Sequence, residues 1–322
     1  MSNNPSTRVL SATDKLVLQE LQKRHTMNLK GSLDTDTYPY RQYLRSIDKL
    51  IENNIITGWV PVFHPFTGDY KKLVWFFVRT NPRDPQDLEF LKSLGGQLVS
   101  LDGIAGPYSL SALIQFVTDQ DFNNSLAYID SRFSIPNPVY QNIKYQWLEI
   151  IAFYKFNGFV ISNDEIPSSQ QANNLKKVLL TAGFRKHRPP TIEDLAAELN
   201  VANSTAQKQL KQLEDNQTIL GYSILINSAY QPQIKVIIQF HIHPSNYSDV
   251  ILSLQEDLHI SILCKIQKES FNLLAVVYMQ SIQDLNIWIT DLYTYKGILD
   301  TLTTIVLKNE HSQKTNEYFP LL

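Results

Sequence analysis

The chain has few of the residues on which several protein classes depend. It contains a single cysteine, Cys264, which excludes an internal disulfide framework and any paired-cysteine metal motif. No apolar run could span a bilayer, because the densest ones, Leu73 to Val78 and Leu148 to Phe153, are far too short. The polar stretch Met1 to Thr13 lacks the apolar segment of a signal peptide. We therefore expect a soluble, cytoplasmic protein with no membrane partner.

Net charge and short catalytic motifs are also scarce. A formal net charge of −2 gives no overall attraction to nucleic acid, so such a function would rest on local patches. Residues 8 to 60 and 173 to 226 carry a slight excess of Lys and Arg over Asp and Glu. No Gly-x-Ser-x-Gly motif and no Gly-rich phosphate loop occur. His241 and His243 alternate along an expected strand and form at most half a metal site, so we predict no metal and no cofactor.

What the sequence does contain is the same module twice, at a constant offset of 163 positions. Gly58 matches Gly221, and the same offset aligns Ile47 with Leu210, Leu50 with Leu213, Phe77 with Phe240, and Tyr108 with Phe271. A repeat of this length indicates a duplicated pair of domains rather than a solenoid, and 322 residues suffice for both copies.

The second copy begins with helical periodicity. A stripe from Leu175 to Leu179 ends at Gly183, and the basic cluster Arg185 to Arg188 follows. Thr191 is expected to cap a short helix, with Asp194 three residues later and Ile192, Leu195, Ala196 and Leu199 on its apolar face. Asn203 or Ser204 is expected to cap a third helix that buries Ala206, Leu210 and Leu213 and stops near Asn216. Two short helices joined by about four residues are typical of a helix-turn-helix.

The first copy follows the same order less clearly. Leu16, Leu18 and Leu21 mark a first helix, and Tyr40 to Asn53 forms the counterpart of the third helix. Lys30 to Thr37, between them, combines glycine with residues that favour turns. We expect the middle helix of this copy to be short, distorted or absent.

Both copies then change to strand periodicity. Trp59 to Phe63 with Leu73 to Arg79, and Ser223 to Ile226 with Ile234 to His243, are expected to form hairpins. The remainder of each copy has the order βαββαβ, which is the ferredoxin-like arrangement of one antiparallel sheet with both helices on one face. Trp75, Phe76 and Phe77 are three consecutive aromatic residues on one expected strand, so the other face of the sheet also needs cover. We expect a second sheet to provide it.

Particular segments carry a resemblance to a known family. They are Ile192 to Val201, Leu210 to Asp215 and Ile219 to Tyr222 in the second copy, and Ile47 to Asn54 and Ile55 to Trp59 in the first. With the order of elements, they resemble the Lrp/AsnC (leucine-responsive, feast/famine) transcription regulators over nearly the whole chain. The resemblance implies an α+β chain with two winged helix-turn-helix units, each followed by a ferredoxin-like sheet domain of the RAM type. The expected divisions are residues 1–68, 69–158, a linker at 159–172, 173–226 and 227–322.

The resemblance also implies a function. We expect a DNA-binding transcription regulator rather than an enzyme, with double-stranded DNA as partner, a pseudo-dimer within one chain and further homo-oligomers through the sheet domains. The start and open face of each third helix would contact DNA, through residues that would equally form a solvated helix face. These residues are Asn203, Ser204, Thr205, Gln207, Lys208 and Lys211 in the second copy, and Tyr40, Arg41, Gln42, Arg45 and Lys49 in the first.

In the family, small-molecule effectors bind near the sheet-domain interfaces, at a turn with the pattern Gly-Asp-aromatic-Asp. The matching turns contribute Gly106, Tyr108 and Ser109, and Glu269, Phe271 and Asn272. The aromatic residue is kept while both acidic positions have changed, which disfavours an ordinary amino-acid effector.

Two alternatives stay open. Fused two-copy proteins that resemble Lrp/AsnC include the siroheme decarboxylases, whose repeated sheet domains enclose a tetrapyrrole and need Arg and His for propionates and protons. The hairpins of this chain offer His64 in one copy and Asn227 and Tyr230 in the other, with no adjacent pair of arginines. The second alternative is a regulator that acts through protein contacts without binding DNA.

Overall fold

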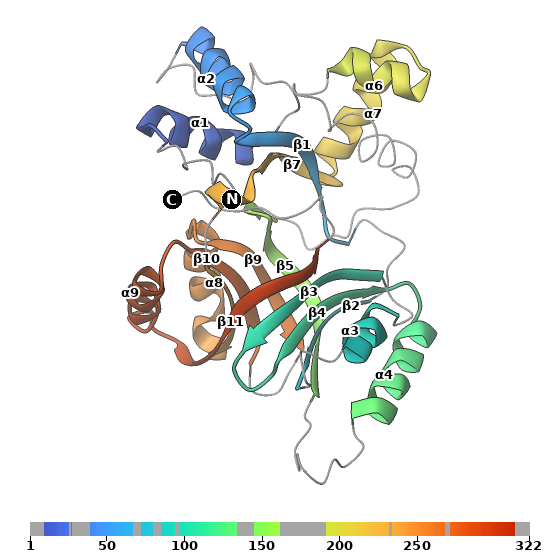
Figure 1. Ribbon diagram of the computed structural model, residues 1–322, viewed down its shortest axis with the longest axis vertical. Coiled ribbons are helices and arrows are strands. Elements are labelled where there is room, and N and C mark those ends of the chain that lie inside the picture. Colours follow the sequence, from blue (N-terminus) through green and yellow to red (C-terminus); the bar gives the residue numbers. More distant parts are fainter. Residues whose placement is uncertain are drawn as a thin grey trace, which may run out of the picture.

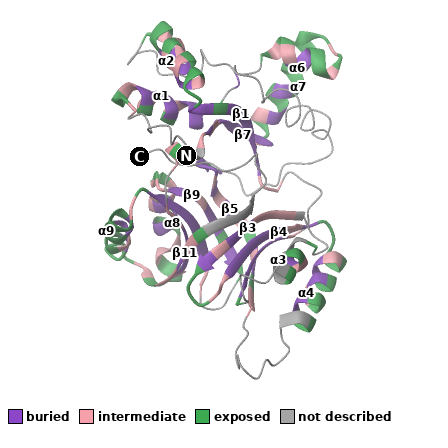
Figure 2. Ribbon diagram, viewed as in Figure 1, coloured by how far each residue is buried: buried purple, intermediate pink, exposed green. Residues whose placement is uncertain are grey.

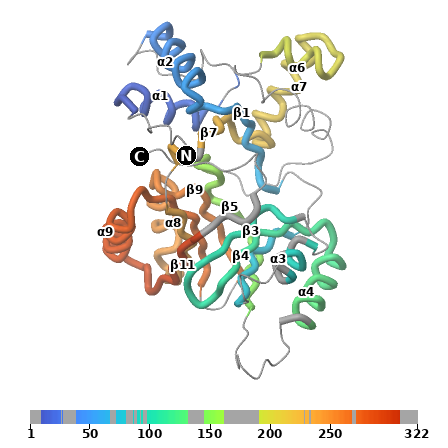
Figure 3. Tube along the Cα trace, viewed as in Figure 1, coloured from blue at the N-terminus to red at the C-terminus, as the bar shows by residue number. Residues whose placement is uncertain are grey.

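The chain forms a helical region stacked on a β-barrel, in a computed structural model (Figure 1, Figure 3). The described residues are 10–25, 27, 39–66, 72–79, 85–93, 97–133, 145–161, 191–231, 234–267 and 271–312. The helical region holds α1 (Ala12–Gln22), α2 (Tyr40–Glu52), α6 (Ile192–Leu199) and α7 (Asn203–Asp215), with the two-stranded sheet of β1 (Ile56–Phe63) and β7 (Ile219–Ile226). None of the described helices is long and apolar enough to cross a membrane.

The repeat predicted from the sequence is confirmed by the elements themselves. Helices α2 and α7 begin and end 163 positions apart, and so do strands β1 and β7. Between helix and strand, Asn54 and Gln217 occupy the same place in the two copies and have φ angles of 54° and 56°. This left-handed conformation reverses the chain tightly, and its recurrence fixes the alignment of the two copies.

The helical region begins as the sequence predicts in most details. Thr191 caps α6 in a capping box with Asp194, and α7 ends at Asn216. The predicted cap of α7 is wrong, because the helix already starts at Asn203 and its N-cap is Ala202, without a side-chain hydrogen bond. Asn200, with φ of 55°, makes the turn between α6 and α7. The predicted first helix of the second copy, the basic cluster 185–188 and the segment 30–37 lie outside the described residues.

The two predicted hairpins do not form. Strand β1 pairs antiparallel with β7 from the other copy, from Ile56 with Ile226 to Phe63 with Ile219. Strands β2 (Lys72–Val78) and β8 (Ile234–Ile242), the expected partners, belong to the barrel instead. The reason is the apolar content of both faces of β1 and β7, which are buried along nearly their whole length. Each needs cover on two sides, and a pairing across the copies places the ribbon inside the helical core.

The barrel is built from both copies. The first contributes β2, α3 (Pro85–Lys92), β3 (Gln97–Ala105), β4 (Leu110–Phe116), α4 (Asp119–Phe133), β5 (Tyr145–Phe156) and the short β6 (Phe159–Val160). The second contributes β8, α8 (Tyr247–Glu256), β9 (Ile260–Gln267), β10 (Leu273–Met279), α9 (Ile282–Leu292) and β11 (Ile298–Ser312), with the short 3-10 helices η4 (Ser228–Tyr230) and η5 (Pro244–Asn246). The strand order is β2-β4-β3-β11-β8-β10-β9-β5-β6, and a further pairing of β2 with β5 closes it.

The prediction of two sheets packed face to face is wrong, because the strands of both copies form one closed barrel. The element order βαββαβ occurs in both copies, and the chain is of mixed α and β class. The strands, however, form one continuous sheet, because β3 pairs with β11 and β5 pairs with β9 across the copies. Unpaired strand edges leave backbone N–H and C=O groups exposed, and joining the edges of the two copies satisfies these groups.

The helices lie outside the barrel and the aromatic side chains divide between its faces. Helices α3 and α4 cover one side and α8 and α9 the other (Figure 1). Trp75 and Phe77 point inward, while Phe76 between them packs outward in the cluster under α3 and α4. Figure 2 shows buried residues along the strands and exposed ones on the outer faces of the helices.

Side chains meet across the barrel interior. The side-chain amide of Gln146 on β5 donates to Oε1 of Gln239 on β8 at 3.2 Å, and these strands are not neighbours in the sheet. Lys235 on β8 forms an ion pair with the fully buried Asp102 on β3 at 3.0 Å, over the intervening β11. An eight-stranded barrel has an interior that side chains can fill, and these contacts cross it.

The connection predicted at residues 159–172 begins inside the fold. Phe159 and Val160 form β6, which pairs with the end of β5, and Phe159 is buried. Ile161 continues this turn, since its N–H donates to the carbonyl of Tyr154 at 3.0 Å. The remainder of the predicted linker, residues 162–172, lies outside the described residues.

Candidate active site at the junction of the helical region and the barrel

The residues predicted to contact DNA lie mostly on open helix faces. Arg41, Gln42 and Arg45 are exposed on α2, and Tyr40 is partly buried against the helical core. Exposed side chains at the start and along the open face of α7 are Asn203, Ser204, Thr205, Gln207, Lys208 and Lys211. A solvated helix face has the same appearance, so exposure assigns no ligand to these residues.

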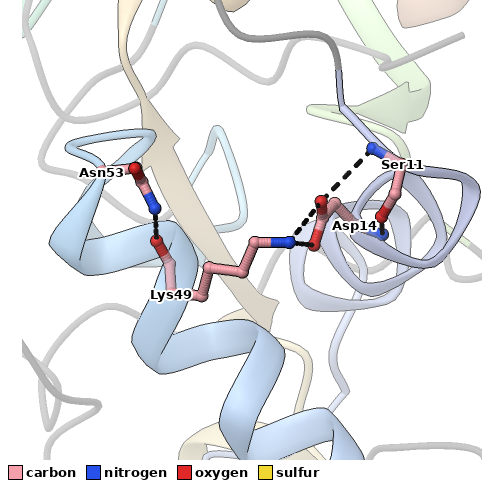
Figure 4. A network of polar contacts seen from close by, with 4 residues as sticks. All are labelled: Ser11, Asp14, Lys49 and Asn53. Carbon is pink, nitrogen blue, oxygen red and sulfur yellow. Dashed lines mark hydrogen bonds and ion pairs between the residues drawn. The ribbon is translucent and has the colours of Figure 1, made fainter.

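Lys49 differs from the other predicted DNA contacts because it has a structural partner. Its ammonium forms an ion pair with the carboxylate of Asp14 on α1 at 3.2 Å (Figure 4). Asp14 also accepts from the backbone N–H of Ser11 in the capping box of α1. Burial alone would raise the pKa of Asp14, but hydrogen bonds from Ser11 and Lys49 outweigh it and hold this pKa below its ordinary value. The pair joins α1 to α2.

The predicted effector residues are occupied within the fold. The Tyr108 hydroxyl donates to Oε1 of Gln146 at 3.1 Å, and burial raises the pKa of Tyr108. The amide of Asn272 accepts from the N–H of Ile242 and donates to its carbonyl, which ties the start of β10 to the end of β8. Ser109 bonds the carbonyl of Val78, Gly106 is exposed, Phe271 packs at the edge of the barrel core, and Glu269 lies outside the described residues.

Cationic and aromatic side chains gather elsewhere, where the helical region meets the barrel. The residues just after α1 form a two-way backbone bridge to β7: the N–H of Arg24 donates to the carbonyl of Tyr222, and the N–H of Tyr222 donates to that of Arg24. Gly221 allows this approach, because a Cβ there would overlap the ring of Phe159 and lie 2.5 Å from the Arg24 carbonyl oxygen. Three segments distant in sequence therefore meet at one point, which we call the junction.

Arg24 is buried at the centre of the junction. Its side chain is 1% exposed, and its guanidinium carbon lies 5.0 Å from the ring centre of Trp59 and 5.8 Å from that of Tyr222. These are cation–π distances to one ring from each copy. Burial lowers the pKa of Arg24 to about 10, an effect that Tyr222 partly opposes, so the group stays charged at neutral pH.

Two lysines add further positive charge. Lys155 on β5 is 2% exposed and donates to the backbone carbonyl of Asp257 at 2.6 Å. Burial and then repulsion by Lys23 lower the pKa of Lys155 to about 8, against the attraction of Asp257. Burial also lowers the pKa of Lys23. The Asp257 carboxylate accepts hydrogen bonds from His259 and Trp288, so its negative charge is shared between these groups and Lys155.

A path of aromatic rings crosses the junction between two histidines. His25 contacts Phe159 edge-on at 5.7 Å, and Phe159 is the strand partner of Phe156. From there the ring contacts run from Phe156 to Phe153, on to Phe66 and then to His64, with centroid separations of 5.3 to 5.9 Å. Phe66 and Phe156 are only partly buried.

His64, at the end of β1, is held in one tautomer. It is 5% exposed, and its Nδ1 accepts from the N–H of Phe66 at 3.2 Å, so the neutral ring carries its proton on Nε2. Burial lowers the pKa of His64 to about 4. The backbone N–H of His64 donates to Thr218, and the N–H of Asn227 donates to Ile55 in the same way in the other copy. The imidazole therefore occurs at only one of two equivalent places.

The junction combines the chemistry needed for a flat, polyanionic ligand. Buried cations attract carboxylates, aromatic rings pack against a planar system, and an imidazole can carry a proton. Sequence reasoning singled out His64 but missed Arg24 and Lys155. The run Lys23-Arg24-His25 directly after the first predicted helix was a signal, because three basic residues at a helix end are candidates for an anion site.

Comparison with known proteins gives a likeness of fold. No protein-family model matches the chain, and no curated protein matches it. The crystal structure of the siroheme decarboxylase NirDL has a TM-score of 0.63 at 10% identity, covering 95% of this chain and 94% of that one. The same protein in complex with an iron-uroporphyrin III analogue gives 0.61 at 10% identity, covering 94% and 93%. The leucine response regulatory protein LrpA of Mycobacterium tuberculosis gives 0.40 at 20% identity, covering 46% of this chain and 98% of that one.

These findings correct the functional prediction. The structure that matches over nearly the whole of this chain is that of an enzyme, the siroheme decarboxylase NirDL. The expectation of a DNA-binding transcription regulator that is not an enzyme is therefore wrong. A helix-turn-helix pattern is local in sequence and does not by itself fix the function of the whole chain, which explains why it misled the prediction.

Proposed function

We propose that this chain is an enzyme that binds a polycarboxylated tetrapyrrole and removes carboxyl groups from it, in the manner of a siroheme decarboxylase. The observation that carries the proposal is the likeness to NirDL, which extends over nearly the full length of both chains. Because identity is 10%, the likeness concerns the fold, and the chemistry has to be argued from the residues of this chain.

The charges at the junction suit the substrate class. A uroporphyrin-type macrocycle is flat and carries many carboxylates. Burial, and after it repulsion by Lys23, lowers the pKa of Lys155, and a carboxylate bound nearby would oppose both effects. The ring path that includes Phe66, Phe153 and Phe156 offers apolar contact to the macrocycle. Binding would thus draw on both properties of the junction.

His64 is the group we assign to proton transfer. In a decarboxylation the bond between the carboxyl carbon and its neighbour breaks, carbon dioxide leaves, and the electron pair stays on the neighbouring carbon, which then takes a proton. Burial keeps His64 neutral before binding. The negative charge of a bound carboxylate raises the pKa of a nearby imidazole, so substrate binding would bring a proton to His64, which the ring can then deliver to carbon.

The proposal predicts one such centre per chain. The position equivalent to His64 in the second copy is Asn227, whose amide donates to the carbonyl of Asn54 and supports a turn. An amide does not titrate and cannot replace an imidazole as proton carrier.

The test is to incubate the full chain anaerobically with iron-uroporphyrin III and with siroheme. Binding is followed by the absorbance of the macrocycle, and decarboxylation by mass spectrometry as the loss of carbon dioxide. We expect the His64→Asn variant to bind the macrocycle but to lose most of the activity. The double variant Arg41→Ala/Arg45→Ala, which removes two exposed cations from α2, is the matched control and should keep both properties. Equal turnover by His64→Asn and the wild type would remove His64 from the mechanism.

A further inference from the structure

The guanidinium of Arg24 has an unused donor edge inside the protein. Its Nη1 donates to the carbonyl of Met27 at 3.1 Å. Its Nε and Nη2 are buried and have no hydrogen-bond partner. These two nitrogens lie on the same edge of the planar group, where their N–H bonds run parallel and match the two oxygens of one carboxylate. Buried donors rarely lack an acceptor, so this edge requires an explanation.

The other sides of Arg24 are already occupied. Trp59 and Tyr222 lie at cation–π distance, and Met27 takes the remaining nitrogen. The carboxylate of Glu214 accepts from the Tyr222 hydroxyl at 2.8 Å instead. Among the described residues, no carboxylate forms an ion pair with Arg24. Its charge is therefore buried against rings alone, which costs more free energy than burial beside an anion.

A second orphan donor lies next to it. The indole Nε1 of Trp59 is buried without a hydrogen-bond partner. Of the two rings at cation–π distance from Arg24, that of Trp59 is the nearer to the guanidinium. Guanidinium and indole N–H groups can only donate. What these three nitrogens lack in common is an acceptor, and an anion supplies both the acceptor oxygens and the missing charge.

We propose that the Nε and Nη2 edge of Arg24 is the binding site for one carboxylate of the ligand, held by two parallel hydrogen bonds. This inference rests on the proposed function for the identity of the ligand but not for the chemistry of the site. Arg24 is thus a specificity-determining group: it orients the macrocycle by one side chain and leaves the others to the lysines.

The variant that isolates the edge is Arg24→Lys. It keeps the positive charge and a long apolar stem but replaces the planar fork by a compact ammonium. We expect its affinity for iron-uroporphyrin III to fall about 10- to 100-fold, the effect of losing charge-assisted hydrogen bonds. Lys208→Ala, an exposed lysine on α7, is the control and should keep wild-type affinity.

Small anions test the site without any tetrapyrrole. Acetate and inorganic phosphate are added at constant ionic strength against chloride, and the midpoint of thermal unfolding is recorded. A rise with acetate or phosphate in the wild type that is lost in Arg24→Lys supports the anion site, even if iron-uroporphyrin III does not bind and the proposed function fails. Equal affinities for iron-uroporphyrin III and equal responses to small anions in both proteins would overturn the inference.

If Arg24→Lys unfolds before it can be titrated, Arg24→Met decides. This variant removes the buried charge and its unpaired donors together and keeps apolar contact with both rings. An unfolding midpoint at or above that of the wild type, with no response to acetate, supports a site kept for a ligand. A midpoint well below the wild type with an undiminished response to acetate means that Arg24 serves the fold alone and contradicts the proposal.

Discussion

Lys155 provides a prediction whose magnitude follows from its burial. The side chain is 2% exposed, and burial with repulsion by Lys23 lowers its pKa from 10.5 to about 8. Below pH 8 the lysine is protonated in both the folded and the unfolded chain, and the folded state bears the cost of a buried charge. Above pH 10.5 it is neutral in both, and this cost is absent. Between these limits the unfolded chain binds more protons, so stability rises with pH.

The expected size is set by the pKa difference. One pKa unit corresponds to about 1.4 kcal/mol, so the full change is about 3 kcal/mol, most of it reached by about pH 10. In the Lys155→Met variant this contribution is absent while the other titrating groups stay. The free energy of unfolding of the wild type, relative to the variant, should therefore increase by about 2 to 3 kcal/mol between pH 7.5 and about 10.

The assay is urea unfolding of both proteins, followed by tryptophan fluorescence, at closely spaced pH values. Subtracting the two free energies at each pH cancels groups that titrate alike in both proteins. A difference that stays constant across this range would show that Lys155 is not buried as a charge. A difference that falls with pH would mean that the pKa of Lys155 is raised in the folded protein, and would remove Lys155 from the anion-binding argument.

Three further predictions concern packing and proton linkage. Gly221→Ala should destabilise the chain by about 1 to 3 kcal/mol in urea unfolding, because the new methyl group overlaps the ring of Phe159. Adding Phe159→Leu should recover part of that loss, and additive losses would refute the steric explanation. Gln239→Leu should lower the free energy of unfolding by about 1 to 3 kcal/mol, because it leaves the Gln146 amide without its partner across the barrel. In the same assay, the double variant with Gln146→Leu should lose less than the sum of the two single variants, and strictly additive losses would mean that the bond contributes nothing. Binding of iron-uroporphyrin III at pH 8 to 9 should be accompanied by proton uptake, because a carboxylate near Lys155 raises the pKa of this lysine. Calorimetry in buffers of different ionisation enthalpy measures this uptake, and binding enthalpies that do not depend on the buffer would contradict it.

The local elements could be predicted from the sequence because their causes are local. The stripe of Ala206, Leu210 and Leu213 and the Thr191 cap lie within a few residues of one another, and the structure buries and pairs them as expected. The 163-residue repeat has the same origin, since each copy repeats the same short-range pattern, down to the left-handed turns at Asn54 and Gln217.

Barrel closure and the β1–β7 ribbon could not be predicted in this way. Periodicity shows that a strand has a buried face, but it does not name the strand that pairs with it. The alternation of Trp75, Phe76 and Phe77 indicated two covered faces correctly, yet a second stacked sheet and a closed barrel satisfy that alternation equally. The choice depends on how edge strands from the two copies meet.

The candidate site was only partly visible for a similar reason. His64 could be named because a histidine after a strand is noticeable in any sequence. Arg24 and Lys155 can be recognised as candidate site residues only when their burial is known, because Lys and Arg are usually exposed. The contacts expected from the helix faces that carry Lys208 and Arg41 stay a prediction, since these residue types suit solvent as well as DNA.

The proposed function requires that this chain bind a polycarboxylated tetrapyrrole at the junction and remove carboxyl groups from it. The most direct measurement is a single-turnover reaction of the purified chain with siroheme under anaerobic conditions, with the products resolved by mass spectrometry. We expect successive losses of carbon dioxide from the macrocycle, strongly reduced in His64→Asn and unchanged in Arg41→Ala/Arg45→Ala. A chain that leaves the absorbance and the mass of both siroheme and iron-uroporphyrin III unaltered would contradict it.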